Sequence, residues 1–382
     1  MTAKDDKRDV FAVGEEFRGY VIERLLGKGG LGAVYLARHK LLETRFALKV
    51  LYPEVAATNA AYVKRFLREA KIATRIRHPN LVAVHDAGLD EEHGLYYIVM
   101  DWISGGDLRQ AIAFAGRFVP DRAVEVVMQV ASALEAARPF KLVHRDIKPE
   151  NIMIQPDGLV KLVDLGIAKS EGIKDSLSTS AESVFGTPAY VAPEQAVDAS
   201  NVDARADIYS LGVVLFEMIA GKPPYDGANA PQVLAQSLSD EPFPDIRDFN
   251  PTVNPMLAVL IRRMCVKEKE RRIAGPAELL AEFKKLGYTL DSRSAAPVQY
   301  TQSAETAPTQ LSVKDVLDHL PKRKSTLSFE TEDTEIQRFV DDLKRKKTRK
   351  KLLWGALFAV SSIIVAALLA MAFSGGAGAA GR

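Results

Sequence analysis

The first hundred residues of the chain alternate short apolar runs with polar turns. The runs are rich in Val, Leu, Tyr and Phe and are separated by glycines, a pattern that predicts β-strands. The predicted strands are Tyr20–Leu26, Ala33–His39, Arg45–Leu51, Leu81–Ala87 and Tyr96–Asp101. Between the third and the fourth strand we expect a helix at about Ala60–Ile76.

Beyond Asp107 the spacing of apolar residues becomes helical. In Asp121–Ala137 they recur three or four positions apart, which predicts an amphipathic helix. Ile208–Ile219 is apolar nearly all round, which predicts a buried helix. Strands first and helices afterwards indicate an α+β architecture with two unlike lobes.

The composition changes towards the end of the chain. After about residue 290 Ser, Thr, Gln, Ala and Pro dominate, which is typical of a disordered linker. Seven of the eight residues Lys344–Lys351 are basic, and Leu352–Phe373 is then uncharged and mostly apolar. The predicted segments are a polar N-terminal extension (1–16), a folded domain (17–290), a flexible juxtamembrane linker (291–343), a basic cluster (344–351), a transmembrane helix (352–373) and a short tail (374–382).

Charge and cysteine content exclude some classes of function. The formal net charge of +2 is too small to indicate a nucleic-acid partner. Cys265 is the single cysteine, so we expect neither an intramolecular disulfide nor a Cys/His metal site. The first ten residues are mostly charged, with no apolar stretch typical of a signal peptide, and we therefore expect the folded domain to stay in a reducing compartment.

A glycine-rich segment joins the first two predicted strands. Gly27, Gly29, Gly32 and Val34 match the pattern G-x-G-x-x-G-x-V. Dinucleotide-binding turns share this glycine spacing, but a helix follows there, whereas a strand is predicted here. Glycines at such a turn let backbone amides approach phosphates. An ordinary hairpin turn remains the alternative for this motif by itself.

A lysine lies in the third predicted strand. Lys49 follows Phe46-Ala-Leu, and a lysine in an apolar strand needs an anionic partner. Glu69 in the predicted helix is a candidate for that partner. The alternative is a surface lysine whose head reaches solvent and pairs with another carboxylate.

Two further motifs decide the interpretation. His144–Asn151 reads HRDIKPEN, and Asp164-Leu-Gly166 follows. With these motifs the chain, from about Tyr20 to Leu286, resembles the eukaryotic-type (Hanks-type) serine/threonine protein kinase family. The sequences of its motifs are similar to those of bacterial membrane-anchored members. The resemblance implies a bilobal fold with a small β-rich N-lobe and a larger helical C-lobe.

The same resemblance implies ATP and Mg²⁺ as cofactors, with Mn²⁺ able to replace Mg²⁺. The implied nucleotide-binding residues are Leu26, Gly27, Lys28, Gly29, Gly30, Gly32, Val34, Ala47, Lys49, Glu69, Met100, Asp101, Ile103, Asp107 and Met153. The implied catalytic residues are Asp146, Lys148 and Lys49, and the implied metal ligands are Asn151 and Asp164.

In such a kinase Asp146 would accept the proton of the substrate hydroxyl, and Lys148 would stabilise the transferred phosphoryl group. Met100 would be the gatekeeper, Asp101–Ile103 the hinge, and Asp107 the polar end of the ribose pocket. The metal-binding motif departs from the family's Asp-Phe-Gly, but leucine can fill the same apolar pocket.

Further motifs of the family also have counterparts in this chain. Asp207 resembles the aspartate that supports the catalytic loop, and Arg272 resembles the arginine that pairs with Glu194 of Ala-Pro-Glu. Lys148 and the Gly186-Thr-Pro188 segment imply serine/threonine specificity, with dual specificity as an alternative. A pseudokinase that acts as a binding module is the rival function, although no polar group of the site is replaced by an inert residue.

The C-terminal pattern predicts a single-pass protein of the cell (inner) membrane with a cytoplasmic kinase domain. The basic cluster lies on one side of Leu352–Phe373, as expected for the cytoplasmic side, and a buried core helix is the alternative. Expected partners are protein substrates and membrane lipid. Gly355/Ala359 and Ser362/Ala366 also fit a homodimer of the anchor, but such pairs are common in alanine-rich helices.

Overall fold

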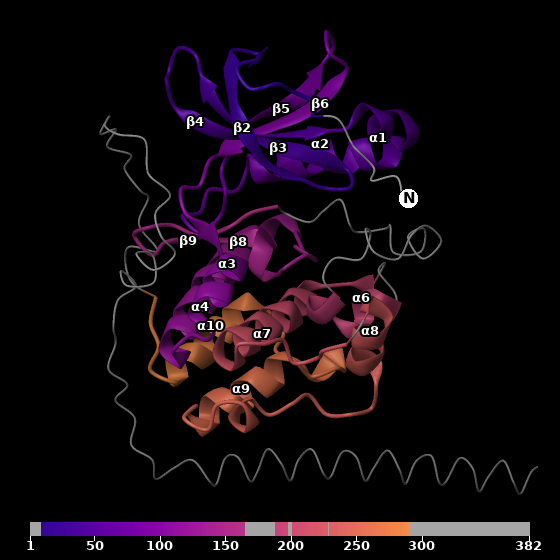
Figure 1. Cartoon of the computed structure of the whole chain (residues 1–382). Helices are drawn as coiled ribbons and strands as arrows, with labels where there is room; N and C mark the ends of the chain where they lie inside the picture. Colours follow the sequence, from indigo (N-terminus) through magenta and orange to yellow (C-terminus); the bar gives the residue numbers. More distant parts are fainter. Residues whose placement is uncertain (1–8, 165–187, 198–200, 228, 291–382) are drawn as a thin grey trace, which may run out of the picture. The chain divides into compact units, whose positions relative to one another are not determined.

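The computed structural model describes residues 9–164, 188–197, 201–227 and 229–290. They belong to one compact unit of the chain. A β-rich lobe is followed along the chain by a helical lobe, so the predicted bilobal α+β fold is confirmed (Figure 1).

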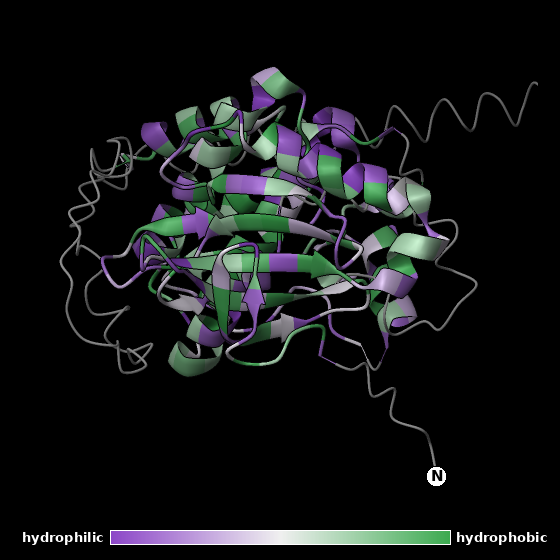
Figure 2. Cartoon of the chain, turned by 90° about the horizontal axis from the view of Figure 1, so that it is seen from above, coloured by the Kyte–Doolittle hydropathy of each residue, from purple (hydrophilic) through white to green (hydrophobic). Residues whose placement is uncertain are grey.

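A six-stranded antiparallel sheet forms the N-lobe, in the order β1-β2-β3-β4-β6-β5. The strands are β1 (Glu16–Phe17), β2 (Tyr20–Lys28), β3 (Gly32–His39), β4 (Arg45–Leu51), β5 (Val84–Asp90) and β6 (Leu95–Asp101). Hydrophobic and hydrophilic residues are mixed along the strands (Figure 2), and the inner strands β4 and β6 are buried at most of their positions.

Two helices follow β4, namely α1 (Pro53–Thr58) and α2 (Ala60–Ala73). The side chain of Asn59 caps α2 by accepting a hydrogen bond from the backbone N–H of Tyr62. The apolar face of α2, including Phe66, packs against residues of β4 and β6. The predicted helix is confirmed, but it ends three residues before Ile76.

The C-lobe consists mainly of helices. They are α3 (Leu108–Ala115), α4 (Pro120–Ala137), α6 (Pro193–Val197), α7 (Ala204–Ala220), α8 (Ala230–Leu238), α9 (Pro255–Met264) and α10 (Pro276–Lys285). Short 3-10 helices occur at η1 (Arg138–Phe140), η2 (Pro149–Asn151), η4 (Pro188–Tyr190), η6 (Ile246–Asp248) and η7 (Lys269–Arg271). Helix α7 is buried on all sides, as predicted for Ile208–Ile219. A Cβ on Gly212 would lie 2.5 Å from Sγ of Cys265, so α7 packs closely against the end of α9.

A small sheet lies where the two lobes meet. It contains β7 (Gly106–Asp107), β8 (Ile152–Ile154) and β9 (Val160–Leu162). Leu81 forms a parallel bridge with Leu162 of β9, and the N–H of Val82 donates to the carbonyl of Leu162 over 3.0 Å. The prediction of a strand at Leu81–Ala87 was therefore wrong at its start, because Leu81 and Val82 bond to β9 and β5 begins only at Val84.

The folded part includes residues before position 17. Phe11 is buried in the N-lobe core, and the hydroxyl of Tyr35 accepts a hydrogen bond from the N–H of Val10 over 2.9 Å. Residues 9–16, which the sequence places in a polar extension, thus contribute to the sheet's packing.

Within the residues described up to 290, none of the helices has the length and apolar character needed to span a bilayer. The predicted linker, basic cluster and transmembrane helix lie outside the described residues, as do the anchor residues proposed for dimerisation.

Candidate active site

The glycine-rich turn connects β2 to β3. It is closed by a 2.8 Å hydrogen bond from the N–H of Gly29 to the carbonyl of Gly32. Gly32 has a structural reason to be glycine, because a Cβ there would lie 2.1 Å from the carbonyl oxygen of Val50. Among the described residues, no atom lies within 4 Å of a Cβ added to Gly27, so packing between them does not explain why it is glycine. Open space over the turn suits the approach of a phosphate group.

Lys49 of β4 reaches from the N-lobe sheet to Asp164, which follows β9. The distance from Lys49 Nζ to Asp164 Oδ1 is 2.6 Å, although 115 positions separate the two residues. Burial lowers the pKa of Lys49, but the charges of Asp164 and of the buried Glu69 outweigh burial, and the pKa is raised. Lys49 is therefore a fixed cation, and the structure brings it together with two of the predicted site residues.

Asp164 has its own constraints. Burial raises the pKa of its carboxyl group, but Lys49, His144 and Lys148 together lower it below its usual value, so the carboxylate stays charged. Its φ of 55° lies in the left-handed region, which residues other than glycine rarely adopt, although aspartate adopts it more often than most. Its side chain is 40% exposed despite the ion pair, which leaves oxygen surface available to a ligand.

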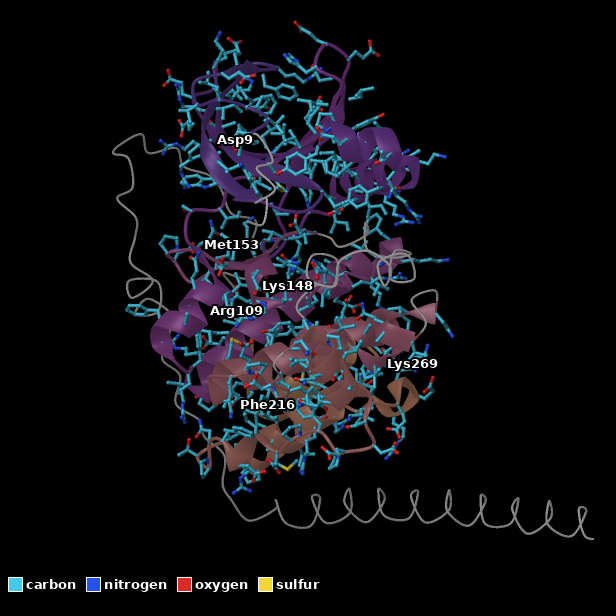
Figure 3. The ribbon with its side chains drawn as sticks, turned by 45° about the vertical axis from the view of Figure 1, so that its right-hand side comes forward. Asp9, Arg109, Lys148, Met153, Phe216 and Lys269 are labelled. Atoms are coloured by element: carbon cyan, nitrogen blue, oxygen red, sulfur yellow. The ribbon has the colours of Figure 1, made fainter. Side chains whose placement is uncertain are left out.

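The catalytic loop brings Asp146, Lys148 and Asn151 together. The side-chain amide of Asn151 donates to the carbonyl of Asp146 over 2.8 Å and to Asp146 Oδ2 over 2.9 Å. Lys148 Nζ lies 3.4 Å from the same carboxylate oxygen. In Figure 3, Lys148 lies in the upper part of the helical lobe, below the sheet. These three predicted residues thus form one cluster.

Asp207, buried in α7, supports the catalytic loop by hydrogen bonds to its backbone. Its two carboxylate oxygens accept the backbone N–H groups of His144 and Arg145, each over 2.8 Å. Arg145 has a φ of 63°, so its conformation needs such support. Burial raises the pKa of Asp207, and burial also lowers the pKa of His144. The supporting role expected for Asp207 is confirmed.

Apolar residues form a separate cluster beside the end of β6. Ala47, Val82 and Met100 are buried together, and Val34 and Val163 pack against them. Of these, Ala47, Met100 and Val34 were predicted from the sequence, whereas Val82 and Val163 were missed because an isolated valine carries no signal of its role. Met153 lies in β8 of the C-lobe, and Leu26 lies in β2.

Asp101, Ile103 and Asp107 follow this cluster along the chain. Asp101 ends β6 and Ile103 is buried. Asp107 caps α3 by accepting the N–H of Gln110 over 2.8 Å, and burial raises its pKa. The helix-capping role occupies one carboxylate oxygen of the residue predicted for the ribose pocket.

Two side chains beside the catalytic loop offer oxygen ligands for the expected Mg²⁺. Because Asn151 uses its amide N–H groups on Asp146, its side-chain oxygen remains an acceptor, and Asp164 adds a charged oxygen. Among the residues described, no group of three or more His, Cys, Asp and Glu could hold a metal ion by itself. Two oxygen ligands fit Mg²⁺, which usually completes its shell with substrate phosphates and water.

Two further networks stabilise the C-lobe side of the site. Arg272 pairs with both carboxylate oxygens of Glu194, over 2.6 and 2.9 Å, which confirms the expected pairing. Arg109 of α3, which the sequence analysis missed, contacts Glu150, Glu217 and Tyr190. Its partners lie far apart in the sequence, so no local pattern could have shown the network.

Comparison with known families decides the classification. A family profile described as protein kinase domain matches residues 20–283. The chain belongs to the protein kinase family. The matched range covers both lobes and every motif residue described above.

Two bacterial proteins are among the relatives of the chain. It is 36% identical over 273 residues to the serine/threonine-protein kinase PrkC of Bacillus subtilis, covering 71% of this chain and 41% of the relative. It is 37% identical over 266 residues to the serine/threonine-protein kinase PknB of Mycobacterium tuberculosis, covering 69% of this chain and 42% of that protein. The chain therefore spans about two fifths of the length of these curated relatives.

Solved structures show the same fold. The crystal structure of the Mycobacterium tuberculosis PknI kinase domain matches with a TM-score of 0.57 and 30% identity, covering 72% of this chain and 99% of that one. Residues 165–187, which include Ser176–Ser183 and Gly186-Thr187, lie outside the described residues.

Proposed function

We propose that this chain is a serine/threonine protein kinase that transfers the γ-phosphoryl group of ATP to protein hydroxyl groups. The observation that carries the proposal is the 2.6 Å ion pair between Lys49 and Asp164. It joins the cation of the N-lobe sheet to a carboxylate beside the catalytic loop. Phosphoryl transfer depends mainly on positioning and charge stabilisation, and this arrangement supplies both.

Each residue of the site has a separate part in the proposed reaction. Lys49 binds the α- and β-phosphates, and its raised pKa keeps it charged. Asp146, oriented by Asn151, accepts the proton of the substrate hydroxyl. Lys148 offsets charge on the transferred group. Mg²⁺, held by Asn151 and Asp164 when bound, would neutralise phosphate charge.

The rival function is a kinase fold that only binds a partner. An assay on the full chain with labelled ATP, Mg²⁺ and a general protein substrate distinguishes the two. We expect phosphate on serine or threonine in the wild type, and a loss of about 10²-fold or more in Lys49→Met and Asp146→Asn, by analogy with removing one preorganised stabilising group. Wild-type protein without transfer, or a Lys49→Met variant within a few fold of it, would contradict the proposal.

Specificity for serine and threonine is part of the proposal. It rests on the resemblance of Lys148 and Gly186-Thr-Pro188 to the family's pattern, and the names of the curated relatives support it. Phosphoamino-acid analysis of the labelled substrate tests it, since phosphotyrosine would indicate dual specificity.

The proposed function also includes activation by autophosphorylation. The candidate sites are Ser176, Ser178, Thr179, Ser180 and Ser183. Arg145, next to the catalytic aspartate, is the proposed partner of the phosphate, because arginine binds phosphate bidentately. Thr179 and Ser180 are the preferred sites. Alanine at all five positions should lower activity, and phosphatase treatment should lower the activity of the wild type only. Unchanged activity of the five-alanine variant would refute the switch.

Membrane attachment through Leu352–Phe373, with the kinase domain in the cytoplasm, completes the proposed function. Only the sequence pattern supports it: an apolar run of membrane-spanning length follows a basic cluster. A homodimer through Gly355 and Ala366 is a secondary proposal. The homodimer would be supported if the wild type can be crosslinked and a variant with leucine at both positions cannot.

A further inference from the structure

A buried lysine lies between the lobes, outside the groups assigned to catalysis. Lys161 is in the middle of β9, and only 6% of the residue is exposed. Its neighbours in the strand, Val160 and Leu162, are fully buried. A lysine is almost never this buried unless its ammonium group is paired.

The partners of Lys161 come from the N-lobe side of the junction. Nζ lies 3.5 Å from Asp101 Oδ2 and 3.4 Å from the carbonyl oxygen of Leu81. Asp101 is the last residue of β6, at the start of the hinge. The ion pair therefore links the small C-lobe sheet to the strand that leads into the hinge.

The other oxygen of Asp101 is bonded as well. Oδ1 is 2.7 Å from Nε2 of His85, which lies in β5. Burial raises the pKa of Asp101, but His85 and Lys161 together lower it below the usual value. One charged carboxylate thus connects β5, β6 and β9.

The backbone around this carboxylate also holds the hinge. The N–H of Asp101 donates to the carbonyl of Ala83 over 2.9 Å, and the N–H of Val82 donates to Leu162 over 3.0 Å. Val82 and Met100 belong to the apolar cluster that borders the predicted adenine site. The side chain of Asp101 is therefore fixed by β5 and β9, while its backbone continues into the hinge.

We propose that Lys161 is a positioning residue for ATP binding, which holds the hinge in its binding conformation through Asp101. The proposal rests on the proposed kinase function, because it assigns the hinge to the adenine of ATP. A fixed hinge lowers the ordering cost of binding, so its loss weakens affinity. Lys49, which is assigned to the phosphates, and Asp146, which is assigned to the substrate hydroxyl, lie outside this contact, and the rate at saturating ATP is unaffected.

The test is a comparison of Lys161→Met with the wild type, on the full chain. We expect KM for ATP, and the dissociation constant of ADP, to rise about threefold to tenfold, the size of one lost hydrogen bond or weak ion pair. The turnover number should stay within about twofold, since no group that touches the phosphates changes. A lysine with a purely structural role would lower the melting temperature without changing KM.

A matched control is Lys267→Met. Lys267 Nζ donates to the carbonyl of Ser239 over 2.7 Å in the C-lobe, so the same substitution removes a similar contact away from the hinge. It should lower the melting temperature and leave KM for ATP unchanged. An equal rise of KM in both variants would overturn the proposal.

A double-mutant cycle with Asp101→Asn tests whether Lys161 acts through this carboxylate. The double variant should have the KM of the single variant with the higher KM, because both changes break the contact between Lys161 and Asp101. Additive effects, or a KM for ATP unchanged in both single variants, would overturn the proposal. If Lys161→Met does not fold, the KM of Asp101→Asn tests the same carboxylate, which then loses its charge towards both Lys161 and His85. Wild-type protein that neither binds ADP nor transfers phosphate would instead refute the kinase function, and this proposal with it.

Discussion

At the scale of single residues, the glycine-rich turn contains glycines of two kinds. Gly32 is required by packing, since an added Cβ would meet the carbonyl of Val50 at 2.1 Å. Within the part of the chain that the structure describes, a Cβ added to Gly29 would meet only the carbonyl of Gly32, at an ordinary 3.8 Å. The proposed phosphate site explains Gly29, whereas the fold itself explains Gly32.

This difference predicts that alanine at Gly32 affects mainly stability, whereas alanine at Gly29 affects mainly ATP binding. Gly32→Ala should cost about 1–3 kcal/mol of unfolding free energy, because the backbone of β4 must move. Gly29→Ala should change stability by less than about 1 kcal/mol, yet raise KM for ATP, because its methyl group occupies the space of a phosphate. Urea unfolding and ATP titration of both variants measure the two effects. Equal stability losses would show that packing explains both glycines.

At the scale of elements, the pattern of apolar residues predicted the long helices and most N-lobe strands. Helix α4 and strand β4 match their predicted ranges within one residue. The prediction failed where distant segments decide the structure: Leu81 and Val82 bond to β9, and β7 and β8 are only two and three residues long. Helix α1 was missed because its six residues are too few for a periodic pattern.

In the site, too, contacts within a short motif could be predicted from the sequence, whereas contacts between distant segments could not. Asp146 and Asn151 lie in one short motif and could be placed together from the sequence. The approach of Lys49 to Asp164 was implied only by family resemblance, since 115 positions separate them. The contact of Lys161 with Asp101 carried no sequence signal, because a single lysine in a strand does not reveal its burial or its partner.

Another contact between elements makes N-lobe stability depend on pH. In the turn between β5 and β6, His93 Nδ1 lies 2.6 Å from Asp90 Oδ2, and Arg18 bonds the other oxygen over 3.1 Å. The hydrogen bond with Asp90 raises the pKa of His93, and the same bond lowers the pKa of Asp90. Stability from His93 is therefore full below its unfolded pKa and is lost as pH rises through the raised one. Stability from Asp90 is present above its unfolded pKa and is lost as pH falls through the lowered one.

We therefore expect His93→Gln to destabilise the chain most between about pH 4 and 6.5, the unfolded pKa values of the two groups. The difference from the wild type should shrink as pH rises above the raised pKa of His93. Arg18→Gln is the control: arginine does not titrate here, so its cost should stay constant across the upper part of this range. Urea unfolding at a series of pH values measures both. A cost of His93→Gln that does not change with pH would contradict the role of the imidazolium.

At the scale of the whole molecule, the sequence predicts an orientation in the membrane. The 22 residues Leu352–Phe373 would span about 33 Å as a helix, close to the bilayer's hydrocarbon core. The basic cluster before them should stay in the cytoplasm, and the kinase domain with it. Protease added to spheroplasts should remove a tag fused after Arg382 and leave the kinase domain intact. Detergent lysis, as a control, should expose both; a protected tag with a digested kinase domain would reverse the orientation.

The contact between the two lobes leads to the last prediction, which concerns ligand binding. Lys49 and Asp164 come from opposite lobes, so a nucleotide bound between them links both and stabilises the folded chain. At a hundredfold excess over its dissociation constant, Mg²⁺–ADP should add about 2.7 kcal/mol, seen as a higher melting temperature. Chelating Mg²⁺ should reduce the shift, because phosphate charge then faces Asp164 without compensation. Lys49→Met should also reduce it, whereas Asp146→Asn should keep it, because Asp146 is assigned to the protein substrate rather than to the nucleotide. An Asp146→Asn variant that lost the shift while Lys49→Met retained it would reverse these two assignments.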